Sequence, residues 1–388
     1  MRTPGALIDP GPPLGPERLA RYSRQLALPG FDAAAQGRLS NARVLVVGAG
    51  GLGSATVPYL AAAGIGTIGV VDTDVVELTN LHRQIVHGMA DIGRPKLDSI
   101  ADTVASIDPA IRVVLHADRL DSGNIMDILA GYDLVLDGSD NFPTRYLVND
   151  AAALAGKPLV WGAILRFHGQ VGVAWAQHGP TYRDLFPAPP PPGTVPSCAT
   201  GGVLPSVCAV IGAIMVTETI KLVTGIGEPL LGKVTNYDAL TGRFRELDYR
   251  TSDDAAPITE LIDYEAFCGA ASGSDEEQSA AGGGDTVDAV ELAGLLESGA
   301  PLQLIDIREP FERAIAAIEP SDFIPLGDLG RRLDSIRRDV PVVLYCHHGT
   351  RSEYALGRLR EAGFDNARHL AGGIDAYSLT ADPALARY

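Results

Sequence analysis

A cysteine and an arginine with four residues between them lie near the end of the chain, in the stretch VLYCHHGTRS. Cys346 ends an apolar run typical of a buried strand, and Ser352 begins a helical pattern. In such a loop the backbone amides point inward, and with the helix dipole they stabilise an anionic sulfur. Arg351 adds a fixed positive charge, and His347 and His348 can add more or lie in solvent. We therefore expect Cys346 to be a reactive thiol assisted by Arg351.

A glycine-rich turn, GAGGLG, follows an apolar run at 43–48 and precedes a helical pattern at 54–64. Glycines permit the tight turn, and the exposed amides at the start of a helix bind phosphate. An acid that ends the next apolar run can bind the hydroxyls of a ribose. The expected nucleotide-binding residues of this motif are Gly48, Gly50, Gly51, Gly53 and Asp72.

The glycine motif alone does not separate NAD from ATP, but the polar residues that follow later apolar runs favour ATP. Cations neutralise the charge that develops on phosphates during adenylyl transfer, and a carboxylate can hold magnesium, whereas nicotinamide chemistry has little need of either. Each charge alone could belong to a solvated loop, so the prediction rests on the set. Its members are Asn80, Arg83, Gln84, Lys96, Asp140 and Asn141.

The apolar pattern indicates an α/β scaffold for these groups. Runs of strand length alternate with helical patterns between residues 43 and 163, as expected for a mainly parallel sheet covered on both faces. From residue 286 the alternation resumes in a smaller α/β domain. The expected organisation is a flexible lead at 1–18, a nucleotide-binding domain at 19–268, a flexible linker at 269–285 and a second domain at 286–388.

Charge and composition argue against several classes of function. The 388 residues carry a formal net charge of −17, which disfavours a broad surface for nucleic acid or anionic membranes. No secretory signal is visible, and the longest apolar run, 203–216, contains a proline and is too short to span a membrane. Four cysteines without a CxxC pair favour reduced thiols. We expect a cytoplasmic protein in which this run is a buried core helix.

Five motifs in order resemble the adenylating domain of ubiquitin-activating-like enzymes, among them the molybdopterin-synthase and thiamine-pathway adenylyltransferases. The motifs are RYSRQ, GAGGLGS, LTNLHRQ, GRPK and DGSDNFPTRYLVND, within about residues 19–249. The resemblance implies a Rossmann-like domain that uses ATP and magnesium. It further implies adenylation of the C-terminal Gly-Gly carboxylate of a ubiquitin-like sulfur carrier protein.

The resemblance also assigns roles to single residues. The glycine turn and Asp72 would cradle ATP, and Asp140 would bind magnesium. Arg24, in RYSRQ, would reach into the site of a partner subunit, which implies a homodimer. The implied phosphate contacts are Asn80, Arg83, Gln84 and Lys96.

A departure from the family concerns zinc. Many relatives hold structural zinc with two CxxC pairs, but the aligned segments here are TYRD (181–184) and YEAF (264–267), beside a lone Cys268. Tetrahedral zinc needs about four thiolate or imidazole ligands. We therefore expect no zinc site, and local packing around residues 258–269 in place of the metal.

The length of the cysteine loop distinguishes two chemistries. Phosphatases with a loop of this shape place five residues between cysteine and arginine, whereas the four found here resemble rhodanese sulfurtransferase domains. The segments LIDIREPFE (304–312) and LAGGIDAY (370–377) fit the same family, within about residues 286–388. This resemblance implies a persulfide on Cys346, loaded by a sulfur donor such as thiosulfate or a cysteine desulfurase.

The other three cysteines differ in their surroundings. Cys198 follows a proline-rich passage and precedes the apolar helix, where a helix N-terminus favours a thiolate. Adenylating relatives often carry a working cysteine in this loop, so we expect Cys198 to act in catalysis or sulfur relay. Cys208 is expected in the core of the apolar helix, and Cys268, which has no partner, is expected to be inert.

The two resemblances together predict an enzyme that adenylates a sulfur carrier and transfers sulfur from Cys346 to form a thiocarboxylate. The pathway would be molybdenum cofactor synthesis, or thiamine, cysteine or tRNA thiolation. Two alternatives stay open. An NAD-dependent oxidoreductase with an accessory redox domain needs a His or Lys pair near the nicotinamide, which we cannot locate. A non-catalytic carrier-binding scaffold would lack Arg83, Lys96 or Asp140, and all three are present.

Overall fold

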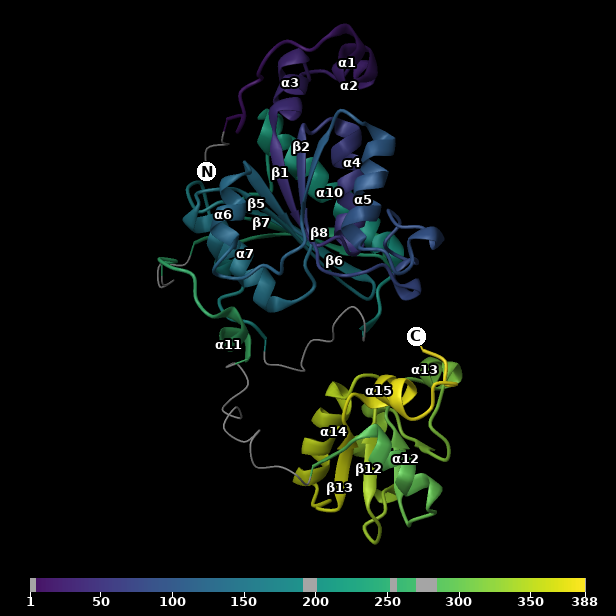
Figure 1. Ribbon diagram of the computed structural model, residues 1–388. Coiled ribbons are helices and arrows are strands. Elements are labelled where there is room, and N and C mark those ends of the chain that lie inside the picture. Colours follow the sequence, from purple (N-terminus) through teal and green to yellow (C-terminus); the bar gives the residue numbers. More distant parts are fainter. Residues whose placement is uncertain (1–4, 191–200, 252–256, 270–284, 388) are drawn as a thin grey trace. The chain divides into compact units, whose positions relative to one another are not determined.

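The computed structural model describes residues 5–190, 201–251, 257–269 and 285–387. The chain divides into two compact units, Met1–Gly273 and Ser274–Tyr388, and each is described by itself (Figure 1). This division falls within the linker expected at 269–285, of which residues 270–284 lie outside the described part of the chain.

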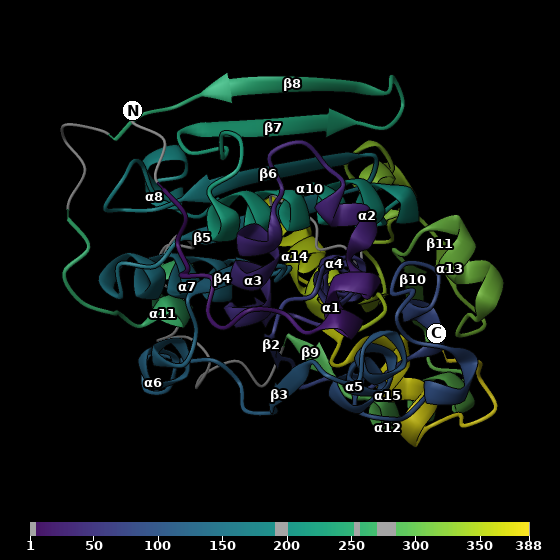
Figure 2. The same ribbon diagram turned by 90° about the horizontal axis from the view of Figure 1, so that it is seen from above.

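The first domain is built on one eight-stranded sheet in the order β3-β2-β1-β4-β5-β6-β7-β8. Its strands are β1 (Arg43–Val47), β2 (Thr67–Val71), β3 (Arg112–His116), β4 (Leu134–Asp137), β5 (Leu159–Leu165), β6 (His168–Ala174), β7 (Lys233–Asp238) and β8 (Arg243–Asp248). The first five strands of the sequence are parallel, as the alternation of strand and helix predicts. From β5 to β8 the strands run antiparallel, and Figure 2 shows β7 and β8 side by side at the edge of the sheet.

Helices cover both faces of this sheet. They are α1 (Pro16–Arg21), α2 (Ser23–Leu26), α3 (Ala33–Asn41), α4 (Gly51–Ala63), α5 (Lys96–Ile107), α6 (Ile125–Ala130), α7 (Phe142–Leu154), α8 (Tyr182–Leu185), α10 (Pro205–Thr224) and α11 (Tyr264–Gly269). In β1, Val44 and Val46 pack in a core with α3, α4, α5 and α10, whereas Leu45 and Val47 pack in a core with α6, α7, α8 and α11. Burial on both faces explains why the parallel strands read as continuous apolar runs.

The chain before α1 differs from the flexible lead expected at 1–18. Leu7 and Ile8 pack against the core, and the Leu7 N–H donates to the Leu222 carbonyl oxygen at 3.0 Å. Arg38 and Asn41 of α3 donate to the carbonyl oxygens of Ile8 and Asp9. Two apolar side chains and three hydrogen bonds therefore hold this segment on the domain.

Helix α10 is the core helix that the apolar run predicts. By length and composition it could cross a membrane, but most of it is buried inside the domain. It packs against α4, β5 and β6, and a Cβ placed on Gly212 would lie 2.6 Å from the Cβ of Ala55 in α4. Cys208, on the same helix, is buried as expected.

The second domain has a five-stranded parallel sheet in the order β11-β10-β12-β13-β9. Its elements are β9 (Thr286–Val287), α12 (Ala289–Glu297), β10 (Gln303–Asp306), α13 (Pro310–Ile315), β11 (Asp322–Phe323), β12 (Val342–Tyr345), α14 (Thr350–Glu361), β13 (Ala367–Leu370) and α15 (Gly373–Thr380). Central strand β12 again serves two cores, with α14 on one face and α12 and α15 on the other. The predicted small α/β domain is confirmed.

Candidate active site

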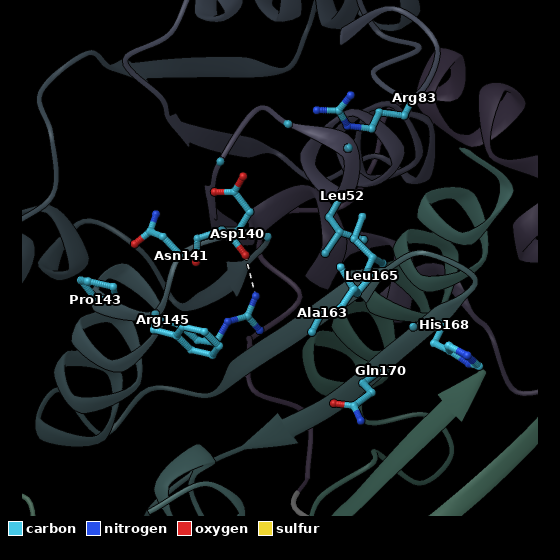
Figure 3. A pocket seen from close by; sticks show the side chains of 18 of the residues that line it. Leu52, Arg83, Asp140, Asn141, Pro143, Arg145, Ala163, Leu165, His168 and Gln170 are labelled. Carbon is cyan, nitrogen blue, oxygen red and sulfur yellow. Dashed lines mark hydrogen bonds between the residues drawn. The ribbon is translucent and has the colours of Figure 1, made fainter. Parts of the chain in front are cut away.

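A pocket of about 1220 Å³ opens at the carboxyl ends of the parallel strands in the first domain (Figure 3). Ligands of open α/β sheets bind at this edge. All but one of the residues predicted to bind ATP and magnesium line the pocket. They are Gly48, Gly50, Gly51, Asp72, Asn80, Arg83, Gln84, Lys96, Asp140 and Asn141.

Gly53 is the exception, and packing explains its place in the motif. A Cβ added at Gly53 would overlap the carbonyl oxygen of Gly48, so the residue lets α4 start close to β1. Gly48 has a φ of 92°, a conformation that other residues rarely adopt. We therefore correct the expected ATP contact of Gly53 to a role in shaping the turn. Helix α4 begins at Gly51, earlier than the predicted residue 54, because the glycine turn forms its first turn.

Asp72 ties the end of β2 to the glycine turn. Its carboxylate accepts hydrogen bonds from the backbone N–H groups of Ala49 (2.7 Å) and Asp74 (2.8 Å). These bonds fix the backbone that would face a nucleotide.

The predicted phosphate contacts are held in different ways. Lys96 is buried, and its Nζ lies 2.7 Å from the Asp74 carboxylate. Arg83 donates to the Thr79 carbonyl oxygen at 3.0 Å. Gln84 is 3% exposed, and its Oε1 has no hydrogen-bond partner among the described residues. A buried acceptor without a partner is uncommon in folded proteins, so this side chain fits a position that a ligand completes.

Asp140 lies in an exposed loop whose backbone is held by buried groups. Asp137, at the end of β4, accepts hydrogen bonds from the N–H (2.9 Å) and hydroxyl (2.5 Å) of Ser139. Arg145 of α7 donates to the carbonyl oxygens of Ser139 (2.5 Å) and Gly162 (2.9 Å) (Figure 3). Burial alone would lower the pKa of Arg145, but the carboxylates of Asp137 and Asp140 raise it above its usual value. The loop that carries Asp140 is therefore anchored through Arg145.

Asn141 lines the pocket and also has a structural role as a helix cap. Its Oδ1 accepts a hydrogen bond from the Thr144 N–H at 2.9 Å and caps the N-terminus of α7. The cap sets the start of the helix that also carries Arg145.

Several lining residues are missing from the sequence prediction. Arg145 and Tyr146 belong to the motif DGSDNFPTRYLVND, which also contains Asp140 and Asn141, so the motif could have indicated them. Residues of the β5–β6 turn carry no such signal, because glycines interrupt β6 and its pattern does not read as a strand. The lining that was missed includes Phe142, Arg145, Tyr146, Arg166, Tyr182 and Phe186.

The segments that stand where relatives have CxxC pairs are joined by an ion pair, which we call the Asp150 clip. Arg183, in TYRD, donates to both carboxylate oxygens of Asp150 at 2.7 Å, and the Tyr264 hydroxyl, from YEAF, donates to Asp150 at 2.7 Å. The Arg183 guanidinium also lies over the Phe267 ring, 4.7 Å from its centre. These contacts are the local packing expected at this point. Within the described ranges, no three His, Cys, Asp or Glu side chains group as metal ligands.

In the second domain, Cys346 lies directly after β12 and before α14. Its Sγ accepts a hydrogen bond from the Gly349 N–H at 3.1 Å, and the Ser352 hydroxyl lies 3.5 Å away. Gly349 has a φ of 97°, which lets the chain turn around the sulfur. The sulfur therefore sits at the N-terminus of a twelve-residue helix, where the helix dipole favours negative charge.

Arg351, expected as a fixed positive charge of the cysteine loop, is held by a carboxylate that the sequence does not indicate. Its guanidinium forms two hydrogen bonds, of 2.8 and 2.7 Å, with the buried carboxylate of Glu312 in α13. A two-pronged pair of this kind fixes the orientation of both side chains. Arg351 therefore clamps the cysteine loop to α13.

His347 and His348 stack with ring centres 3.9 Å apart. Burial, and then the neighbouring His348, lower the pKa of His347 to about 4. His347 is therefore neutral near pH 7 and adds no charge to the loop.

The remaining predicted residues lie outside both sites. Arg24 is exposed on α2 and does not line the pocket. Cys198 lies outside the described residues. Burial, with the Glu265 carboxylate, raises the pKa of Cys268 to about 11, in keeping with an unreactive thiol. Asp306 and Arg308 form a fully buried ion pair that supports β10 beside β12.

Comparisons with known proteins match both domains. The ThiF family model matches residues 22–258, and the rhodanese-like domain model matches residues 288–380. The chain is 50% identical over 388 residues to the probable adenylyltransferase/sulfurtransferase MoeZ of Mycobacterium tuberculosis, with 98% of each covered. It is 40% identical over 397 residues to the adenylyltransferase and sulfurtransferase MOCS3-2 of Zea mays, with 96% of this chain and 81% of that protein covered.

One further relative and one solved structure each match about two thirds of the chain. The sulfur carrier protein adenylyltransferase of Thermus thermophilus is 50% identical over 264 residues, which cover 65% of this chain and 97% of that protein. The crystal structure of E. coli MccB with MccA-N7isoASN superposes with a TM-score of 0.56 at 22% identity, over 64% of this chain and 74% of that one, and so shares the fold. With both domains matched along nearly its whole length, the chain belongs to the family of adenylyltransferase/sulfurtransferase enzymes that join a ThiF domain to a rhodanese-like domain.

Proposed function

We propose that this enzyme adenylates the C-terminal Gly-Gly carboxylate of a ubiquitin-like sulfur carrier protein and then exchanges a carboxylate oxygen for sulfur from Cys346. The observation that carries the proposal is the ThiF-domain pocket, in which the glycine turn meets Arg83, Lys96 and Asp140. The name of the Thermus relative, a sulfur carrier protein adenylyltransferase, supports the class of substrate.

The first step is adenylyl transfer. A carboxylate oxygen of the carrier attacks the α-phosphorus of ATP, the bond to the β-phosphate breaks, and pyrophosphate leaves. The backbone amides of the glycine turn and the side chains of Arg83 and Lys96 stabilise the charge that develops on the phosphates. The product is an acyl-adenylate of the carrier.

Magnesium is the proposed cofactor of this step, and the donor groups of the pocket fit it. Mg²⁺ in proteins is bound by one or two carboxylates together with substrate phosphates and water. The exposed carboxylate of Asp140 lines the pocket and is free of hydrogen bonds to other described residues. Asp140 would hold the ion together with ATP, and a bound ion neutralises phosphate charge.

The second step is sulfur transfer. The outer sulfur of a Cys346 persulfide attacks the acyl carbonyl, and AMP leaves, so the carrier is joined to Cys346 through an acyl disulfide. A second thiol, for which we propose Cys198, attacks the Cys346 sulfur and releases the carrier thiocarboxylate. The resulting Cys198–Cys346 disulfide is reduced by a cellular dithiol, and thiosulfate or a cysteine desulfurase reloads Cys346.

The assembly and cell compartment are part of the proposal. Arg24 is exposed on α2 of the single chain, as a residue that completes the pocket of a second copy would be. We propose a homodimer in the cytoplasm, where thiols stay reduced.

ATP–pyrophosphate exchange and mass spectrometry of the carrier test the two steps separately. We expect Cys346→Ala to keep carrier-dependent exchange and to lose thiocarboxylate formation, and Asp140→Ala to abolish exchange. If Cys346→Ala still makes thiocarboxylate without added sulfide, the relay is wrong. Undiminished exchange by Asp140→Ala contradicts the magnesium assignment.

The same assays distinguish the alternatives. An NAD-dependent oxidoreductase would show no carrier-dependent exchange and would oxidise or reduce a nicotinamide cofactor. A carrier-binding scaffold would bind the carrier and show neither activity.

A further inference from the structure

The turn between β5 and β6 places a cation at the pocket that no other described residue neutralises. Arg166 lines the pocket and is exposed, and its guanidinium forms no hydrogen bond or ion pair within the described part of the chain. The other cations of the lining are engaged: Lys96 with Asp74, Arg83 with a backbone carbonyl, and Arg145 with two carbonyls. Figure 3 shows Leu165 and His168, which flank this turn, at the pocket.

The backbone of Arg166 is held in a conformation that favours glycine. Its φ is 54°, the one positive φ of a non-glycine residue among those described. The Arg166 N–H donates to the Gly202 carbonyl oxygen at 2.9 Å, and the Arg166 carbonyl accepts from the Leu204 N–H at 2.8 Å. These bonds fix the turn in place. Residues other than glycine that hold a strained, positive φ are found most often at ligand and active sites.

The turn also lies close to the glycine loop. A Cβ added to Gly51 would lie 3.5 Å from the Ile164 side chain and 3.8 Å from the Arg83 side chain. The end of β5 and the predicted phosphate contact Arg83 therefore meet around Gly51, and Arg166 follows Ile164 by two residues.

Adenylyl transfer must bring two anions together. The carrier carboxylate and the α-phosphate repel each other unless a cation accompanies each. With Arg83 and Lys96 beside the phosphates, the carboxylate needs a separate cation, and a guanidinium matches a carboxylate with two parallel hydrogen bonds.

We propose that Arg166 binds the carboxylate of the carrier's terminal glycine and holds it for attack on the α-phosphorus. The inference rests on the proposed function, since it names the group that the adenylation site uses to hold the carrier. It gives Arg166 a role different from that of the phosphate-binding residues, because Arg166 would bind the carrier and not ATP.

The test measures ATP–pyrophosphate exchange by the full-length enzyme with a Gly-Gly-tailed carrier that the wild-type enzyme uses. Arg166→Gly removes the charge and suits the positive φ, so the turn keeps its conformation. We expect the KM for the carrier to rise about 10- to 100-fold, the range for a lost charge-assisted hydrogen bond, with the KM for ATP unchanged. Arg166→Lys should restore part of the loss, and Arg243→Ala, which removes an exposed charge on β8, should change neither constant.

A carrier with an amidated C-terminus identifies the group that Arg166 binds. With a non-hydrolysable ATP analogue present, the wild-type enzyme should bind the amidated carrier more weakly than the unmodified carrier, by a similar factor. The Arg166→Gly enzyme should bind the two carrier forms with equal, low affinity. An increase in the KM for ATP instead of the carrier, or equal losses by Arg166→Gly with both carrier forms, overturns the proposal. If the wild-type enzyme shows no exchange with any carrier, the proposed function fails, and the role of Arg166 fails with it.

Discussion

Replacing Asp150 by asparagine should lower the free energy of unfolding of the ThiF domain by about 3 kcal/mol. The carboxylate is 2% exposed and accepts two hydrogen bonds from Arg183 and one from Tyr264, all of 2.7 Å. Removing one partner of a buried ion pair costs about 3–5 kcal/mol, because the other charge stays buried without compensation. Arg183 keeps 20% of its side chain exposed, so the lower end of that range applies.

Tryptophan fluorescence measures this loss without interference from the rhodanese domain. Both tryptophans of the chain, Trp161 and Trp175, belong to the ThiF domain, and the Trp161 ring lies 5.1 Å from the ring of Tyr182, which precedes Arg183. For a domain of this size, a loss of 3 kcal/mol corresponds to a fall in Tm of about 6–12 °C.

Matched variants separate the clip from a general effect of charge. Asp102→Asn removes a carboxylate whose ion pair with Arg94 is exposed, and should change the unfolding energy by less than about 0.5 kcal/mol. Arg183→Met should cost nearly as much as Asp150→Asn, and the double variant should cost much less than the sum. A loss below about 1 kcal/mol for Asp150→Asn, or a fall in the wild-type Tm when a chelator is added, would refute the view that this ion pair holds the two segments together.

Three further predictions follow from the two sites. Arg145→Met should reduce the kcat of pyrophosphate exchange about 100-fold with partial recovery in Arg145→Lys, because Arg145 positions the loop of Asp140, and steady-state kinetics checks this. Gly53→Ala should cost about 1–3 kcal/mol in urea unfolding, because α4 must move away from Gly48. The pKa of His347 is about 4 in the folded rhodanese domain, so the unfolded chain binds more protons between pH 6.5 and 4. Stability should therefore fall as the pH falls through this window. His347→Gln should flatten that fall, as measured by hydrogen exchange of the domain.

The sequence predicts those parts of the fold in which local pattern and burial agree. The parallel strands β1, β2 and β4 are buried along nearly their whole length and read as apolar runs, so their positions follow from the sequence. Strand β8 is exposed at every residue and carries alternating charges without an apolar face, so no local signal marks it. The run KVTNYDAL predicts a strand where β7 lies, but the antiparallel pairing of β6 with β5 leaves no local signal in the sequence.

The candidate sites likewise contain residues that the sequence predicts and contacts that it does not. The glycine turn, Asp72 and Cys346 follow from motifs whose chemistry depends on neighbours in the sequence. The partner of Arg351 does not, since Glu312 precedes it by 39 residues and meets it only after β10 and β12 pair. Long-range ion pairs leave no local pattern, which is why the sequence indicates the fixed charge of Arg351 but not the carboxylate that holds it.

The Asp150 clip has a consequence for an enzyme whose chemistry generates reactive sulfur. Persulfides exchange sulfur with accessible thiolates, so a structural site built from four thiolates would share the reactivity of the substrate. A carboxylate, a guanidinium, a phenol and a phenyl ring do not take up sulfur. The Asp150 clip therefore joins the two segments through groups that the sulfur chemistry proposed for Cys346 would leave unmodified.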